Sequence, residues 1–247
     1  MERKDTVMNE METLKQWIED SKRIVFFGGA GVSTESGIPD FRSVDGLYNQ
    51  KYAYPPETII SHSFYKRNPK EFYRFYKDRM IYQDAEPNAA HKALAKLEEE
   101  GKLCSVITQN IDGLHQMAGS KKVLELHGSI HRNYCEKCRK FYSLDYVVQS
   151  KGVPKCECGG TVKPDVVLYE EGLDTDTINQ AVYELKHADM LIVGGTSLVV
   201  YPAAGMIDYY KGNKMVLINL APTSRDNMAD LIIKGKIGEV FEEILGK

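Results

Sequence analysis

The residues best suited to chemistry stand directly after predicted strands. Asn110 and Asp112 lie in the polar run Gln109–Asp112 after one strand, and His127 follows the next. The carboxyl ends of parallel strands share one edge of a sheet, where ligands bind. A histidine there can act as a general base, beside amide and carboxylate groups that orient a ligand. Both residues also have a structural alternative to a role in chemistry. Asp112 can cap the next helix, and a single histidine after a strand more often supports the fold than acts in a reaction.

Four of the five cysteines form two close pairs. Cys135 and Cys138 are followed, after 17 intervening residues, by Cys156 and Cys158. Four thiolates in this pattern suit a tetrahedral structural zinc ion, and an all-cysteine set leaves no open position for catalysis. A redox disulfide is the alternative, which a reducing cytosol disfavours. The fifth cysteine, Cys104, lies in an apolar run and is predicted to be buried in the core.

Two glycine-rich turns also follow predicted strands, at 28–31 and 194–197. Glycine lets the backbone approach a ligand closely, and free N–H groups at a following helix bind anions. However, Thr34 stands where the third glycine of the dehydrogenase fingerprint belongs, and no acidic residue closes a second strand about twenty residues on. From the glycines alone, a nucleotide site and an ordinary tight turn are equally good interpretations.

The elements that position these residues alternate along the chain. Strands are predicted over 23–27, 103–108, 123–126, 189–193, 214–218 and 231–233, and helices over 8–21, 32–36, 87–100, 113–118, 175–187, from 201, and 237–245. This alternation predicts an α/β fold with a Rossmann-like, doubly wound parallel sheet.

Two segments interrupt the alternation. Residues 43–86 are rich in aromatic and basic side chains and contain two proline-marked helix starts, whereas 129–163 holds the cysteine pairs. We predict that this helical module and this zinc ribbon pack together as a smaller domain. The larger domain would comprise 1–42, 87–128 and 164–247, with the active site in the groove between the two.

Charge and hydropathy exclude several other classes of protein. The chain of 247 residues has a net charge of −3, which argues against general nucleic-acid binding. No apolar run approaches the length of a membrane span, and the charged beginning of the sequence has no secretory apolar region. A cytoplasmic protein is therefore expected. No pattern in the sequence sets the oligomeric state, and a monomer is the default.

Several strings together resemble the sirtuins, which are NAD-dependent protein-lysine deacylases. They are G-A-G-V-S-T-E-S-G-I-P-D-F-R at 29–42, T-Q-N-I-D at 108–112, H-G at 127–128, G-G-T-S-L-V-V at 194–200 and I-N-L at 218–220. They occur in the family's order over nearly the whole chain. The resemblance, to the bacterial or archaeal type, implies an NAD-binding Rossmann-like domain. It also implies a deacetylase that uses NAD as co-substrate, transfers the acyl group to ADP-ribose and releases nicotinamide.

The resemblance also implies roles for individual residues. His127 would deprotonate a ribose hydroxyl, Asn110 would orient a water or hydroxyl, and Asp112 would hold the nicotinamide amide. Activity should then fall below about pH 6.5, the ordinary histidine pKa. The implied NAD contacts are Gly29, Ala30, Gly31, Thr34, Phe41, Arg42, Gln109, Asn110, Ile111, Asp112, His127, Gly195, Thr196, Ser197, Asn219, Leu220 and Ile237. An acylated lysine peptide would pair with the main chain of Val166 and Val167.

The chain departs from the family pattern at two points. The spacing of Cys156 and Cys158 is one residue tighter than usual, although four ligands remain. Glu170 stands where the family usually has glycine, which affects the expected peptide preference near that point.

Three other functions are consistent with parts of the sequence. Tyr76 and Arg79 have the spacing of the sirtuin subclass that removes succinyl and malonyl groups, and i and i+3 share a helix face. Such a pair can also arise by chance in a segment crowded with these residue types. A nicotinamide dehydrogenase shares the glycine turn but not the third glycine or the zinc. A non-catalytic NAD- or peptide-binding module would not need Asn110, Asp112 and His127, which are all present.

Overall fold

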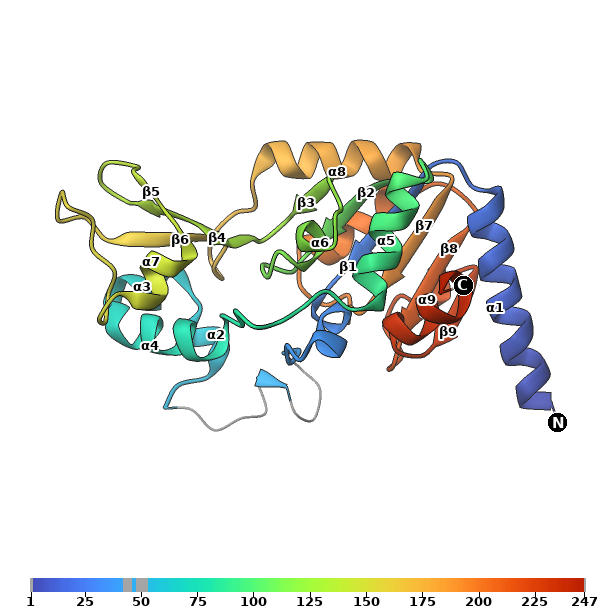
Figure 1. Ribbon diagram of the computed structural model, residues 1–247, viewed down its shortest axis with the longest axis horizontal. Coiled ribbons are helices and arrows are strands. Elements are labelled where there is room, and N and C mark those ends of the chain that lie inside the picture. Colours follow the sequence, from blue (N-terminus) through green and yellow to red (C-terminus); the bar gives the residue numbers. More distant parts are fainter. Residues whose placement is uncertain (1, 42–45, 48–52, 247) are drawn as a thin grey trace.

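The computed structural model describes residues 2–41, 46–47 and 53–246 (Figure 1). Its α-helices are α1 (Glu2–Asp20), α2 (Pro56–Ile59), α3 (His62–Arg67), α4 (Pro69–Arg79), α5 (Ala89–Glu99), α6 (Leu114–Met117), α7 (Leu144–Gln149), α8 (Thr175–His187) and α9 (Ile237–Leu245). Its strands are β1 (Ile24–Gly28), β2 (Leu103–Thr108), β3 (Val123–Glu125), β4 (Gly128–Cys135), β5 (Phe141–Tyr142), β6 (Val162–Val166), β7 (Met190–Gly194), β8 (Met215–Asn219) and β9 (Leu231–Lys234). Among the described helices, none has the length and apolar character needed to cross a bilayer.

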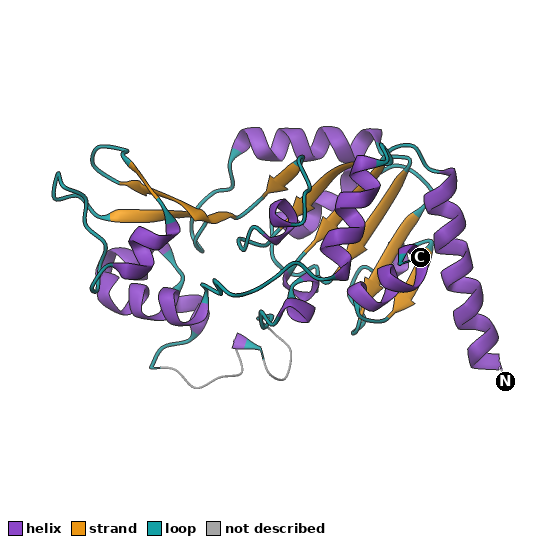
Figure 2. Ribbon diagram, in the orientation of Figure 1, coloured by secondary structure: helices purple, strands orange, loops and turns teal. Residues whose placement is uncertain are grey.

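A six-stranded parallel sheet forms the larger part of the molecule, with strand order β3-β2-β1-β7-β8-β9. Figure 2 shows its strands in orange, with helices in purple around them. Strands β4, β5 and β6 form a separate sheet, so β7 is the fourth strand of this one along the chain. The strand order is therefore that of the Rossmann fold, in which the direction of strand addition reverses after the third strand. The reversal lies between β1 and β7, where parallel folds bind ligands. The prediction of a Rossmann-like doubly wound sheet is therefore confirmed.

Apolar side chains cover both faces of this sheet. Along β1, Ile24 and Phe26 join a core with α1, α5 and α9, whereas Val25 and Phe27 join a core with α8 and the 3-10 helix Ala203–Tyr209. Alternate residues of a strand point to opposite faces, so a strand buried on both sides must be apolar throughout. This explains the uninterrupted apolar run that precedes the first glycine turn.

The smaller part of the molecule lies at the other end of Figure 1 and combines the two predicted insertions. A three-stranded antiparallel sheet, β5-β4-β6, packs against α2, α3, α4 and α7 through one shared apolar core. This core includes the fully buried side chains of Tyr65, Tyr73 and Tyr76. The two proline-marked helix starts are confirmed, since Pro56 and Pro69 each begin a helix. Gly128, which begins β4, pairs with Val166, which ends β6, so both residues lie at the same end of the small sheet.

Three local predictions differ from the structure. The helix predicted over 32–36 is a pair of 3-10 helices, Ala30–Val32 and Thr34–Ser36, ended by Gly37 in a left-handed conformation. The helix predicted from 201 is also 3-10 rather than α. Cys104 is partly exposed rather than buried, although the other residues of β2 are buried.

Candidate active site

The two glycine turns meet backbone to backbone at the reversal between β1 and β7. The Gly31 N–H donates to the Gly195 carbonyl oxygen at 2.8 Å, and the Gly195 N–H donates to the Ile218 carbonyl oxygen at 3.1 Å. A Cβ on Gly31 would lie 2.8 Å from the Gly195 Cα atom, which leaves no room for a side chain. The glycines thus allow two loops to form one surface at the edge of the sheet.

A cavity of about 520 Å³ opens above this edge, between the large sheet and the small module. Its volume is within the range of small-molecule sites in proteins. With two exceptions, it is lined by all the residues predicted to bind NAD or peptide. Arg42 lies outside the described residues, and Tyr76 does not line the cavity. The structure therefore brings together residues that are distant in the sequence.

A hydrogen-bonded chain joins the first loop to the residues after β2. The Asn110 amide Nδ2 donates to the Ser33 hydroxyl at 3.1 Å, and that hydroxyl donates to Asp112 Oδ2 at 2.7 Å. Ser33 and Asn110 are buried, so each bond is shielded from water. No local pattern in the sequence indicates these contacts of Ser33, because their partners lie nearly eighty positions away.

Asp112 is fixed from two further directions. Its Oδ1 accepts from the Leu114 N–H at 2.9 Å, at the first residue of α6, although the N-cap residue of that helix is Gly113. Its carbonyl oxygen accepts from His131 Nε2 at 2.9 Å. Burial raises the pKa of the Asp112 carboxyl, whereas the bonds from Leu114 and Ser33 oppose this rise by favouring the charged form. The loop is thereby tied to both parts of the molecule, because His131 belongs to β4.

His127 is half-buried at the cavity wall in a fixed tautomer. Its Nδ1 lies 2.9 Å from the Gln109 carbonyl oxygen, which can only accept, so Nδ1 carries the proton. The other nitrogen, Nε2, is then the basic one. Burial lowers the pKa of His127, and the bond to Gln109 partly offsets this effect. A neutral imidazole with its basic nitrogen available is what a general base at neutral pH requires.

The second glycine turn is held by side chains from neighbouring strands. The Thr196 N–H donates to Asn219 Oδ1 and the Asn219 amide returns a bond to the Thr196 carbonyl, both at 3.0 Å. Gln109 Nε2 donates to the Thr196 hydroxyl, also at 3.0 Å. These bonds hold the predicted NAD contacts Thr196 and Asn219 side by side in the cavity wall.

The segment 166–171 forms the wall on the side of the small module. Val166 ends β6, and the Val167 N–H donates to the His127 carbonyl oxygen at 3.0 Å. The Tyr169 N–H donates to the Ile60 carbonyl oxygen at 3.1 Å. An extended backbone at the edge of a cavity is the arrangement to which a peptide can add as a further strand.

The structure does not place Tyr76 and Arg79 together at the cavity. Tyr76 is fully buried, stacks on Phe72 with ring centroids 5.7 Å apart, and its hydroxyl has no hydrogen-bond partner among the described residues. Arg79 lines the cavity and pairs with Asp78 at 2.7 Å. The expectation that both side chains reach one ligand is thus not met, because the tyrosine faces the core of the small module.

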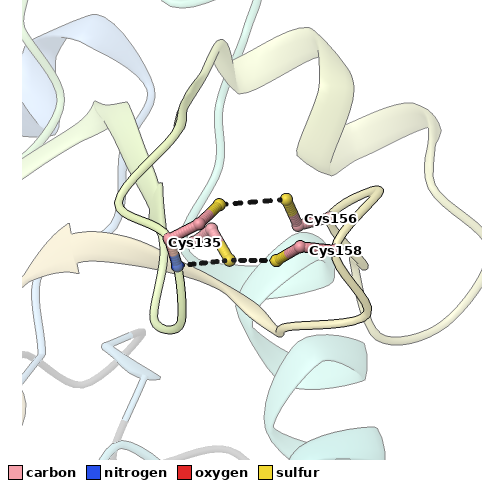
Figure 3. Close-up of side chains that lie close together, drawn as sticks. Cys135, Cys156 and Cys158 are labelled. Carbon is pink, nitrogen blue, oxygen red and sulfur yellow. Dashed lines mark hydrogen bonds between the residues drawn. The ribbon is translucent and has the colours of Figure 1, made fainter.

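The four cysteines converge at the far end of the small module (Figure 3). Their sulfur atoms all lie within 4.8 Å of one another, and the pairs Cys135–Cys158 and Cys138–Cys156 are 3.5 Å apart. Sulfurs bound tetrahedrally at 2.3 Å from zinc would lie about 3.8 Å apart, whereas a disulfide bond is about 2.05 Å long. The set therefore fits one structural zinc ion, and the tight spacing of Cys156 and Cys158 does not prevent it.

Comparisons with known proteins agree with this geometry. A sequence model of the Sir2 family matches residues 29–202. An NAD-dependent protein deacetylase from Clostridium acetobutylicum is 59% identical over 243 residues, which cover 97% of this chain and 99% of that protein. A solved Sir2 complex with a deacetylated p53 peptide and 3′-O-acetyl-ADP-ribose is 39% identical, with a TM-score of 0.88 over 96% of this chain and 98% of that chain. Sir2Tm bound to a propionylated peptide is also 39% identical, with a TM-score of 0.85 and the same coverage.

Proposed function

Because this chain belongs to the Sir2 family, we propose that it is an NAD-dependent protein-lysine deacetylase that releases nicotinamide and O-acetyl-ADP-ribose. The observation that carries the proposal is the position of His127. Its Nδ1 is bound to the Gln109 carbonyl, so its basic nitrogen is Nε2, in a cavity that Asn110 and Asp112 also line. Relatives with this activity are similar over nearly their whole length.

The cavity residues suit the two substrates. NAD, when bound, supplies the ribosyl carbon to which the acyl oxygen transfers as nicotinamide departs. The glycine turns, with Thr196 and Asn219, would hold its adenosine and phosphates, and Ile111 with Asp112 would hold the nicotinamide amide. Phe41 would exclude water from the reacting carbon. Val166 and Val167 would pair with the main chain of the acylated peptide, which reads backbone more than sequence.

His127 would act as the general base on a ribose hydroxyl. The Gln109 carbonyl keeps the Nδ1 proton in place, so the proton removed from the substrate is taken by Nε2. Asn110, whose amide is oriented by Ser33, would place a water or hydroxyl beside it. The zinc would hold the small module together and would take no part in the reaction, because four cysteine ligands leave no open position.

Four further proposals concern the domains, the location, the oligomeric state and nucleic-acid binding. We propose that 1–42, 87–128 and 164–247 form the NAD-binding domain, and that the two insertions form the small one. The chain would act in the cytoplasm, as a monomer, without binding nucleic acid. The net charge of −3 supports the last of these.

The proposed function is tested with NAD and acetyl- and succinyl-lysine peptides of one sequence, with products identified by mass. We expect nicotinamide release, deacetylated peptide and a clear preference for acetyl, because the Tyr76 hydroxyl is buried away from the cavity. Arg79→Met should leave the acetyl-to-succinyl ratio nearly unchanged. A preference for succinyl that this substitution abolished would instead establish the desuccinylase alternative.

The same incubation separates the other classes of function. A dehydrogenase would change the absorbance of the reduced nicotinamide without releasing nicotinamide. A non-catalytic module would bind NAD or peptide without any product. Either outcome would contradict the proposed deacetylase.

We expect the acid limb of the pH profile to lie below pH 6.5, the ordinary histidine value. Burial lowers the pKa of His127, so its imidazole stays neutral to a lower pH than a free histidine. Activity is then lost as the pH falls through this lowered pKa. The measurement is kcat/KM for an acetyl-lysine peptide against pH, and an acid limb at or above 6.5 would assign it to another group.

This measurement needs a control for acid unfolding. Burial also lowers the pKa of His91 to about 4 and that of His115 to about 3. Below pH 6.5 the unfolded chain takes up protons that these buried rings do not. Their contribution to stability is therefore complete above pH 6.5 and declines as the pH falls toward the folded-state values. Circular dichroism at each pH separates this loss from the titration of His127.

A further inference from the structure

Glu170 has a backbone conformation that residues other than glycine rarely adopt. Its φ angle is +76°, in the left-handed region that favours glycine. The residue lines the cavity and lies within the segment 166–171, which is the wall proposed to receive the peptide. A strained residue persists only where its surroundings hold it in place, and such residues gather at functional sites.

The carboxylate of Glu170 provides that restraint. It accepts two hydrogen bonds from Ser63, one from the backbone N–H at 2.8 Å and one from the hydroxyl at 3.0 Å. Ser63 lies in the first turn of α3, where backbone N–H groups have no partner within the helix and a negative charge is favourable. The side chain thus connects the cavity wall to the helical module.

Further hydrogen bonds join the segment 166–171 to the residues at the start of α3. The Tyr169 N–H donates to Ile60 at 3.1 Å, and the His62 N–H donates to the Tyr169 carbonyl at 3.0 Å. The neighbouring Glu171 accepts from His62 Nδ1 at 2.7 Å and from the Leu168 N–H at 2.9 Å. Main-chain bonds fix the wall as far as Tyr169, and Glu170 fixes the turn that follows.

We propose that Glu170 is a positioning residue for peptide binding, which fastens the segment 166–171 to α3 in advance of substrate binding. An ordered segment loses less conformational entropy when a peptide strand pairs with it, so the restraint acts on affinity rather than on the chemical step. This role rests on the proposed function, because the segment is assigned to peptide binding there. It differs from a direct contact, since both carboxylate oxygens are bonded to Ser63.

The test compares Glu170→Gly and Glu170→Gln with the unchanged protein. Glycine removes both bonds and frees the turn, so KM for an uncharged acetyl-lysine peptide should rise about five- to tenfold, with kcat changed less than about twofold. Glutamine keeps an oxygen that can accept one bond from Ser63, so its KM should lie between the two. Glu99→Gln, which alters an exposed carboxylate on α5, is the matched control and should leave KM unchanged.

Hydrogen exchange supplies a readout that needs no turnover. Amides of 166–171 should exchange faster in Glu170→Gly, whereas those of β1 and β7 should not. An unchanged KM together with unchanged exchange would overturn the proposal, and so would a lower melting temperature with unaltered KM, which indicates a structural role only. A rise in KM confined to peptides with a basic neighbour of the acyl-lysine, and abolished by salt, would indicate direct charge contact instead. If the unchanged protein showed no turnover, the proposed function would fail, and the exchange result would still decide the restraint.

Discussion

Replacing His127 by alanine should lower the turnover of an acetyl-lysine peptide by about two to four orders of magnitude, the usual range for loss of a general base. The imidazole is oriented by one bond, from Nδ1 to the Gln109 carbonyl, and alanine removes both the orientation and the basic nitrogen. Peptide binding should survive, because the main-chain bond from Val167 to the carbonyl of residue 127 does not depend on the side chain. Nicotinamide release measures turnover, and titration calorimetry measures peptide affinity.

A second histidine serves as the control for this experiment. His187 also bonds through Nδ1 to a backbone carbonyl, that of Tyr183 at 2.7 Å, but it is exposed at the end of α8. His187→Ala should therefore retain full activity. Turnover within a factor of a few in His127→Ala would mean that His127 is structural and that another group removes the proton.

Replacing Cys135 or Cys156 by serine should release the zinc and unfold the small module. Both residues are buried, at 0% and 5% exposure, in the core that joins the small sheet to its helices. Metal binding and local folding are coupled where the ligands hold the chain together, so loss of one ligand weakens both. Mass spectrometry measures the metal content, and limited proteolysis of residues 129–163 measures the unfolding of the small module.

The fifth cysteine gives the matched control. Cys104 lies in β2, away from the cluster, and Cys104→Ser should keep its zinc and its resistance to protease. The large sheet should remain folded in all three variants, because its two cores contain no cysteine ligand. A protein that kept full stability after complete chelation would exclude a structural role for the metal.

The sequence by itself determined the fold class and the metal ligands. A strand buried on both faces must be apolar throughout, and glycine is required where two backbones approach, so β1 and its turn are visible as a local pattern. The same holds for the cysteine pairs, since a structural zinc ion needs four ligands and these commonly stand in two close pairs along the chain. These features depend on residues near one another in the chain, so the order of the amino acids alone is enough to indicate them.

Contacts between distant segments were decided only by the tertiary structure. Ser33 links Asn110 to Asp112 because the first loop folds over the end of β2, and no spacing in the sequence encodes that contact. His131 reaches the Asp112 carbonyl for the same reason, from a strand of the small sheet.

The tertiary structure also decided between interpretations that the sequence left open. Tyr76 and Arg79 share a helical spacing, but packing of α4 turns the tyrosine into the aromatic core and leaves only Arg79 at the cavity. Glu170 departs from the family pattern, yet its bonds to Ser63 hold the left-handed turn in place. In both cases the outcome depends on which neighbours surround a side chain, and those neighbours come from elements far apart in the sequence.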